Sequence, residues 1–421
     1  MARSRLALYV LLFSLITVNY GDRVALSIGA KPIAAEFHIS TVGMGYLLSC
    51  FLWSYVVCLI PWGAMTDWIG IRAVGSIGIA LWSAATVLTG FAPGLAWLFG
   101  ARLAMGAGEA SAFPAAGRAV REWVPAKEYG LANMLVVSGG YAGPAIGAAL
   151  FGWFADRLGW REAFLALGAV GFIWLLAAAV WFRRPAGTEP VAMRPRAEHP
   201  RPTMAGFRPL VSSVSMWGLF LTQGACVYSH YLFLTWLPSY LQTTRNLSIL
   251  KTGLLSAIPF AATVFCSLAL AWLSDRLLRG RDRQTGTRRW MVAAMLLVSA
   301  VVLLTPFVDT LWVILVLVTV SLTGTSAATG LNSALLADLL PSPANAGTAT
   351  GVLVVGGNIF GLLAPIVTGY VIAWTGSYDV AWLISGGLLL AGMILALTMT
   401  RKPIGEGSRP PAVASAPPLS A

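Results

Sequence analysis

Charged side chains are scarce in this sequence: Asp, Glu, Lys and Arg make up 10% of its 421 residues, whereas soluble globular proteins carry about 25%. Hydrophobic residues account for 57%. A chain with so few charges cannot cover itself with a hydrated surface, which excludes a soluble globular protein. Because each crossing of a bilayer takes roughly 20 apolar residues, the chain is long enough for about a dozen membrane-spanning helices.

Cysteine is scarce as well, and clusters of catalytic residues are missing. The four cysteines all lie within apolar runs, which favours packing roles over disulfides or metal ligands. They are Cys50, Cys58, Cys226 and Cys266. No nucleophile–base set, metal-ligand cluster or phosphate-binding loop stands out. We therefore expect neither an enzyme nor a protein that holds a metal or another cofactor.

Long apolar runs dominate what is present. They predict an all-α membrane protein with twelve transmembrane helices, arranged as two pseudo-symmetric bundles of six. The predicted spans lie near residues 7–30, 41–64, 74–92, 97–120, 129–153, 162–182, 212–241, 251–274, 289–307, 311–337, 345–374 and 379–399. An even number of spans puts both termini on the same side of the membrane.

The net charge of +12 reflects topology and does not indicate nucleic-acid binding. Most Lys and Arg fall on one side of the predicted spans. The other side has only Lys31, Arg157, Arg161, Arg245 and Lys251. Since cytoplasmic loops carry the excess of Lys and Arg, this asymmetry predicts that both termini and the central loop are cytoplasmic.

One long polar stretch divides the spans into two groups. Residues 183–209 contain six Pro and six Arg, and they predict a cytoplasmic linker. It would join an N-terminal bundle, residues 1–182, to a C-terminal bundle, residues 210–400. Residues 401–421 are rich in Pro, Ser and Ala, and predict a disordered cytoplasmic tail.

The two groups of spans also show an internal repeat. Four glycines recur at a displacement of 217 residues: Gly139, Gly140, Gly152 and Gly159 match Gly356, Gly357, Gly369 and Gly376. Parallel repeats of this kind are typical of transporters whose substrate binds between the halves, near the middle of the bilayer.

The loop after the second span carries a motif. Residues 63–72 read Gly-Ala-Met-Thr-Asp-Trp-Ile-Gly-Ile-Arg. They resemble the loop signature of the major facilitator superfamily, G-x-L-x-D-R-x-G-R-[RK], with departures at Met65, Trp68 and Ile71. The resemblance implies a motif for conformational change, composed of Gly63, Asp67, Gly70 and Arg72, with Asp275 as a counterpart in the second half.

Ionisable residues lie deep in the predicted spans only in the first half: Asp22, Arg23, Arg102 and Glu109. Each is a functional candidate, because an ionisable group in a bilayer is costly unless paired or hydrated. Arg102 and Glu109 are seven residues apart and share a helix face, separated by about 10 Å. They are too distant to pair directly but can line one cavity. Glu109 is either a proton-carrying carboxyl or the structural partner of a cation on a neighbouring helix.

Asp22 and Arg23 are neighbours near one end of the first span, so their side chains diverge by about 100°. Asp22 can turn toward Arg102 or solvent while Arg23 faces a central cavity. A free guanidinium there would bind a carboxylate through two parallel hydrogen bonds. The alternative is an interfacial ion pair at the mouth of the bundle.

Three segments carry a closer resemblance: N-Y-x-D-R at residues 19–23, R-L-x-x-G-x-G-E-A-x-x-F-P at 102–114, and T-W-L-P-x-Y at 235–240. They are similar to the anion:cation symporter family, which includes bacterial galactonate, glucarate and phthalate transporters and the lysosomal sialic-acid exporter. The resemblance implies proton-coupled uptake of carboxylates by alternating access. It assigns proton sites to Asp22 and Glu109 and a switching partner to Arg102, and it brings Arg23 and Tyr55 to the substrate.

Polar residues of the second half are further candidates for substrate binding: Tyr231, Trp236, Asn332, Ser333 and Asn358. For the polar groups among them, an interhelical hydrogen bond is an equally good interpretation. His230 is better explained as a packed neutral histidine than as a proton relay. Asp338 lies at a helix end and suggests a structural role.

The fifth span departs from the sugar-acid members of the family, which carry a polar amide where this chain has Gly139-Gly140 and then Tyr141. That difference leaves aromatic or short aliphatic carboxylates open. A drug/proton antiporter, an uncoupled facilitator and a membrane sensor are the alternatives to a symporter. We expect a small organic anion, protons and the lipid bilayer as partners, no nucleic acid, and a monomer in a bacterial inner membrane.

Overall fold

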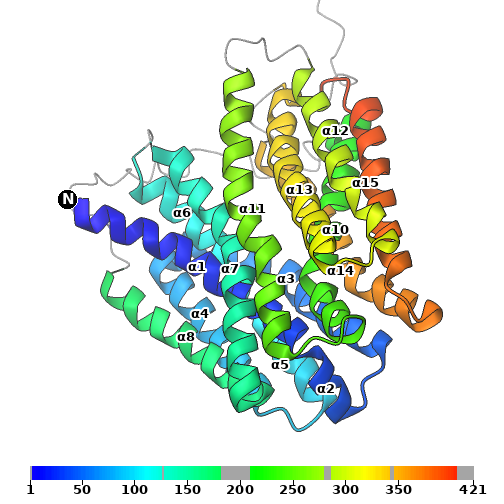
Figure 1. The fold of residues 1–421 in the computed structure, drawn as a ribbon. Helices are drawn as coiled ribbons and strands as arrows, with labels where there is room; N and C mark the ends of the chain where they lie inside the picture. The colour runs from blue at the N-terminus through cyan, green and yellow to red at the C-terminus, as the bar shows by residue number, and fades with distance from the viewer. Residues whose placement is uncertain (1, 126–127, 182–208, 279–285, 342–345, 405–421) are drawn as a thin grey trace, which may run out of the picture.

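The computed structural model describes residues 2–125, 128–181, 209–278, 286–341 and 346–404, where the regular elements are helices (Figure 1). The first half contains α1 (Ala2–Ile28), α2 (Ala30–Phe37), α3 (Thr41–Ile69), α4 (Ile71–Gly90), α5 (Leu95–Glu109), α6 (Ala112–Trp123), α7 (Tyr129–Leu158) and α8 (Trp160–Trp181). The second half contains α10 (Val214–Thr243), α11 (Ile249–Leu278), α12 (Thr287–Ser299), the 3-10 helix η3 (Ala300–Phe307), α13 (Leu311–Leu339), α14 (Ala346–Thr375) and α15 (Asp379–Met399). The predicted linker and most of the predicted tail lie outside the described residues.

Within the described ranges, ten helices are long and apolar enough to cross a membrane. Two further segments correspond to the other predicted spans. The more polar α10 has 30 residues and is buried along most of its length. The predicted span at 97–120 is divided between α5 and α6, and the span at 289–307 is α12 followed by η3.

The break between α5 and α6 places Glu109 at the last residue of α5. Ala110 and Ser111 close the turn, with the N–H of Ser111 donating to the carbonyl of Gly108 at 3.1 Å. Pro114 has no N–H, so it cannot donate to the carbonyl of Ala110 as a regular helix requires. The proline therefore interrupts the helix directly beside a buried carboxyl.

Two long helices, α7 and α14, join the halves. α7 packs on α1 of its own half and on α11 of the other, while α14 packs on α10 and on α3 in the same way. At these crossings Gly152 lies on Gly253 and Gly369 lies on Gly45. A Cβ added to Gly152 or Gly369 would lie 3.0 or 3.4 Å from the Cα of its partner glycine. The repeated glycines thus allow backbones from different halves to approach closely.

The last glycines of the repeat end the two helices. α7 ends at Leu158 and is followed by Gly159 with φ +98°, while α14 ends at Thr375 and is followed by Gly376 with φ +68°. Residues with a Cβ are strained at such angles, whereas glycine is not. The displacement of 217 residues therefore reflects the same helix ending in both halves.

The halves meet at the end of the bundle that carries α2, called here the α2 end. Lys31 donates to the carbonyl of Gln242 at 3.2 Å, and the amide of Gln242 donates to the carbonyl of Ile28 at 2.8 Å. Nearby, Ser49 of α3 donates to the carbonyl of Leu362 of α14 at 2.8 Å. At the opposite end α6 and α11 lie apart, so the halves are splayed there (Figure 1).

The opposite end carries the loop motif. Arg118 of α6 pairs with Asp67 at 2.9 Å and also donates to the carbonyl of Thr66. Gly70, with φ +85°, separates α3 from α4, while Trp68, which replaces the usual arginine, is 88% exposed. The side chain of Asp275 in α11 lies outside the described residues.

In the second half Asp338 pairs with Arg288. This contact between α13 and α12 agrees with the structural role expected for Asp338.

Candidate functional site

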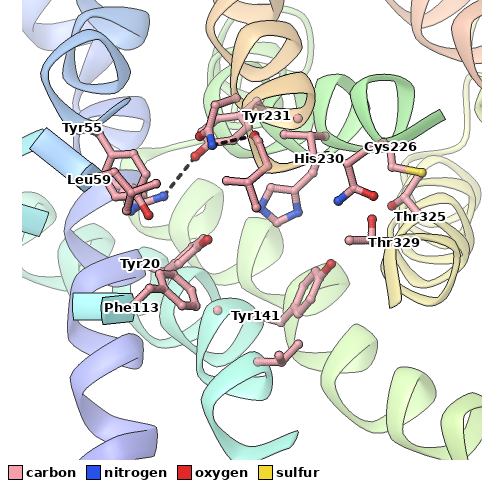
Figure 2. A pocket seen from close by; sticks show the side chains of 18 of the residues that line it. Tyr20, Tyr55, Leu59, Phe113, Tyr141, Cys226, His230, Tyr231, Thr325 and Thr329 are labelled. Carbon is pink, nitrogen blue, oxygen red and sulfur yellow. Dashed lines mark hydrogen bonds between the residues drawn. The ribbon is translucent and has the colours of Figure 1, made fainter. Parts of the chain in front are cut away.

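A cavity of about 540 Å³ lies between the halves. Its walls come from α1, α3, α6 and α7 on one side and from α10, α13 and α14 on the other. Aromatic rings and a few polar groups converge on this space (Figure 2). The polar and aromatic members of the lining are Tyr20, Arg23, Tyr55, Phe113, Tyr141, Gln223, His230, Tyr231, Thr325, Thr329 and Asn358.

Arg23 is the cation of the cavity wall, and each of its three side-chain nitrogens donates a hydrogen bond. Its Nε donates to a carboxylate oxygen of Glu109 at 2.7 Å. One terminal nitrogen donates to the hydroxyl of Tyr231 across the interface, and the other donates to Asn19 one turn earlier on α1, both at 3.0 Å. The pair joins two helices of the first half, and Tyr231 ties it to the second.

Aromatic rings enclose the guanidinium. Its central carbon lies 4.2 Å from the ring centroid of Tyr20 and 4.9 Å from that of Tyr55. Cation–π contacts of this kind are stronger where water is excluded, and Arg23 is 2% exposed. The rings therefore hold the cation at the cavity surface without neutralising it.

Glu109 is fully buried, and only one of its carboxylate oxygens has a partner. Among the described residues, the oxygen that does not meet Arg23 accepts no hydrogen bond. The sequence left open a structural ion pair between Glu109 and a cation of a neighbouring helix. The structure has such a pair, and its cation is Arg23 of α1.

Asp22 and Arg102 lie behind this pair and do not line the cavity. Both carboxylate oxygens of Asp22 lack a hydrogen-bond partner among the described residues, although the side chain is 1% exposed. Arg102 donates to the sulfur of Met105 at 3.1 Å and lies over the ring of Phe51 at 5.0 Å. Arg102 is close enough to both acids to act on them electrostatically, without a direct ion pair.

The structure corrects two details of the sequence interpretation. Arg23 was expected to be a free guanidinium, and Arg102 and Glu109 were expected to line one cavity, but neither of these two residues lines it. The guanidinium of Arg23 is not free either, since Glu109 pairs with it in this conformation. The separation expected between Arg102 and Glu109 agrees with the absence of an ion pair between them.

The remaining substrate-binding candidates divide into two groups. Tyr55, Tyr231 and Asn358 line the cavity with Arg23. Trp236 does not line it: its indole donates to the carbonyl of Pro365, and it faces a second cavity of about 510 Å³ at the α2 end.

Asn332 and Ser333 also lie outside the lining. Asn332 is buried between helices, where its amide donates to Gln223 and to the carbonyl of Leu219, both at 3.0 Å. This is the interhelical hydrogen bonding given as its alternative. Ser333 is exposed and donates to the carbonyl of Thr329.

Sequence reasoning missed several lining residues, above all Tyr20, Gln223, Thr325 and Thr329. The sequence could have indicated Tyr20, because it precedes Arg23 by three residues, and three residues make close to a full turn of a helix. The residues of α13 gave no such signal, because Thr is common in membrane helices and only helix packing determines which face meets the cavity.

Comparison with known proteins supports the same interpretation. A sequence model of the Major Facilitator Superfamily matches residues 12–285 and 281–420. The chain is 30% identical to the probable galactarate/D-glucarate transporter GudP of Escherichia coli over 94% of this chain and 93% of that protein. It is 32% identical to the probable sulfoacetate transporter SauU of Cupriavidus necator over 90% of each, and 30% identical to a D-galactonate transporter of Escherichia coli over 87% and 89%.

Among solved structures, a bacterial homologue of the human lysosomal transporter Spinster, in an inward-facing and unoccupied conformation, matches with a TM-score of 0.68 and 19% identity. The match covers 94% of this chain and 95% of that one. The twelve-helix fold and the resemblance read from the motifs are thereby confirmed. The chain belongs to the Major Facilitator Superfamily and is a membrane transporter, not an enzyme.

Proposed function

We propose that this protein imports an organic anion together with protons, by alternating access between two conformations. The observation that carries the proposal is the buried ion pair between Arg23, which lines the central cavity, and Glu109, which lies behind it. The relatives support the substrate class, since their names give galactarate, D-glucarate, D-galactonate and sulfoacetate as cargo.

The pair provides a means of coupling. An ionised Glu109 occupies the Nε of Arg23, so a substrate carboxylate meets competition for the same guanidinium. Once Glu109 takes up a proton, the attraction falls and Arg23 can bind the substrate carboxylate through two parallel hydrogen bonds. After the substrate leaves, loss of the proton restores the pair. Proton and anion then bind together for an electrostatic reason.

Asp22 fits a second proton site. Burying an ionised carboxylate without a partner costs much free energy of desolvation, whereas burying the protonated group costs much less. Arg102 lies close by and can favour the ionised form when the surroundings change, which is the switching role that the resemblance implied. The cavity wall also argues against a cationic drug as cargo, because Arg23 would repel it.

Glu109→Gln tests the proposal, because Gln mimics a permanently protonated acid. Purified protein in proteoliposomes is scored for counterflow and for uptake driven by an inward proton gradient, with D-galactonate, D-glucarate and sulfoacetate as probes. We expect counterflow to survive, since exchange does not require the empty carrier to reset. Uphill uptake should fall to background.

Glu162→Gln is the matched control, because Glu162 is exposed at the start of α8, away from the cavity. It should leave both assays unchanged. If Glu109→Gln still concentrates a probe against its gradient, Glu109 is not the coupling group. If the wild-type protein exchanges a probe but never concentrates it, the protein is an uncoupled facilitator.

A further inference from the structure

The two halves present corresponding faces to the cavity, and helix contacts define which positions correspond. Gly139 and Gly140 of α7 pack on Phe13 and Tyr20 of α1. In the second half, Gly356 and Gly357 of α14 pack on Phe220 and Val227 of α10. Phe220 follows Phe13 by 207 positions, and Val227 follows Tyr20 by the same number. This offset relates Arg23 of α1 to His230 of α10.

The acid of the pair also has a counterpart. Gly108 of α5 packs on the backbone of Trp82 in α4, and Gly324 of α13 packs on the backbone of Ser299 in α12. The position after Gly108 is Glu109, and the position after Gly324 is Thr325. The second half therefore has His230 and Thr325 where the first half has its ion pair, and both line the cavity.

His230 is held in place by aromatic contacts. Its ring makes edge-to-face contacts with Tyr141 at 5.4 Å, Tyr231 at 5.7 Å and Phe260 at 6.1 Å between centroids. Among the described residues its Nδ1 is buried without a hydrogen bond. Thr325, which occupies the position that corresponds to Glu109, donates to the carbonyl of Leu322 and not to His230.

This arrangement differs from that of a histidine buried for packing alone. A buried polar nitrogen without a partner is costly, so most are satisfied in native structures. Here the ring points into the same space as Tyr20 and Tyr141 (Figure 2). Because His230 and Arg23 both line the cavity, a substrate in it can give the imidazole a hydrogen-bond partner while Arg23 holds its carboxylate.

We infer that His230 is a specificity-determining residue, which binds a second polar group of the substrate remote from the carboxylate held by Arg23. The inference rests on the proposed transport of organic anions. It narrows the substrate class to anions with a hydrogen-bonding group at the far end, such as a hydroxyl, a second carboxylate or a sulfonate. A simple aliphatic monoacid offers no hydrogen-bond partner to His230.

Matched probe pairs test the inference by calorimetric titration of the purified protein. D-galactonate is compared with 6-deoxy-D-galactonate, which lacks the remote hydroxyl, and sulfoacetate with acetate, which lacks the remote sulfonate and its charge. In the wild-type protein, the member of each pair that carries the remote polar group should bind on the order of tenfold more tightly than the other, as expected for one buried hydrogen bond. His230→Phe should reduce this ratio to near one.

Two further variants separate binding from packing. His230→Gln keeps a hydrogen-bond donor but loses the edge-to-face contacts, whereas His230→Phe keeps the ring and loses the nitrogens. A binding role predicts that Gln preserves more discrimination than Phe, and a packing role predicts the reverse order. Phe260→Leu, which disturbs the ring contact from outside the cavity lining, should leave the ratio unchanged.

The outcomes also separate this inference from the proposed function. If wild-type protein binds none of the four probes, the proposed function and the inference both fail. If it binds them without discrimination within the pairs, or if His230→Phe keeps the discrimination, only the role of His230 is overturned.

Discussion

At the scale of single residues, the proposed function depends on which anion occupies Arg23. The guanidinium meets Glu109, Asn19 and Tyr231 in this conformation, so binding a substrate carboxylate requires an exchange of partners. Glu109 is the partner whose attraction depends on a proton. Asn19 and Tyr231 can stay in place and keep the fork of the guanidinium oriented for the incoming carboxylate.

Replacing Arg23 should therefore weaken anion binding strongly without preventing folding. Arg23→Ala should weaken binding of D-galactonate, D-glucarate or sulfoacetate by about 2–5 kcal/mol, as for the loss of a buried charged partner. Arg23→Lys should recover only part of this, because an ammonium group lacks the planar fork. Calorimetric titration measures the affinities, with Arg157→Ala, an exposed site at the end of α7, as control. Unchanged affinity in Arg23→Ala would move the anion site elsewhere in the cavity.

The sequence predicted the charged residues of the site better than their partners. Asp22, Arg23, Arg102 and Glu109 stand out because charges are rare in membrane spans, and that signal is local. Pairing depends on where helices bend and how they cross. Nothing in the spacing of Arg102 and Glu109 shows that the carboxyl of Glu109 meets Arg23 of α1.

At the scale of helices, apolar runs predicted the membrane spans well. They did not predict where a short extra helix occurs or where a span is interrupted. The predicted second span begins at residue 41, as α3 does. The short α2 was not predicted, because eight residues are too few for a span and its pattern is weak. The predicted span at 97–120 is interrupted at Ala110 and Ser111, shortly before Pro114, although both residues keep helical backbone angles.

The glycine crossings between the halves make a prediction about conformation. A Cβ on Gly45 would lie 2.6 Å from the carbonyl oxygen of Pro365, and one on Gly253 would lie 2.4 Å from that of Ala148. Backbone atoms cannot swing aside as flexible side chains do, so each Ala variant should destabilise the closed α2 end by about 1–3 kcal/mol. The population should shift toward a conformation that is open at this end.

Spin labels at Ala35 and Thr244, both exposed and on opposite halves, report the separation of the α2 end by pulsed electron resonance. We expect longer distances in Gly45→Ala and Gly253→Ala than in the parent protein. Gly351→Ala in α14 is the control, because its Cβ would meet nothing within 4 Å. Distances that match the parent in both crossing variants would show that these contacts do not govern closure.

At the scale of the whole molecule, the open question is which side of the membrane the splayed end faces. The α2 end carries Lys31, Arg245 and Lys251, three of the few basic residues on the sparse side of the predicted spans. The opposite end carries Arg118 and Arg288 in ion pairs. Since excess Lys and Arg marks the cytoplasmic side, we expect the splayed end to face the cytoplasm.

Reporter fusions test this orientation. A reporter that is active only in the cytoplasm should give signal when fused after Arg196 and none when fused near Thr244, because the first site belongs to the basic side and the second to the α2 end. The reverse pattern would contradict the distribution of Lys and Arg. It would also turn the central cavity of this conformation toward the outside. In that orientation the substrate would reach Arg23 from outside and displace Glu109 as the anion is captured. In the expected orientation the anion leaves Arg23 for the cytoplasm, and Glu109 then re-forms the ion pair.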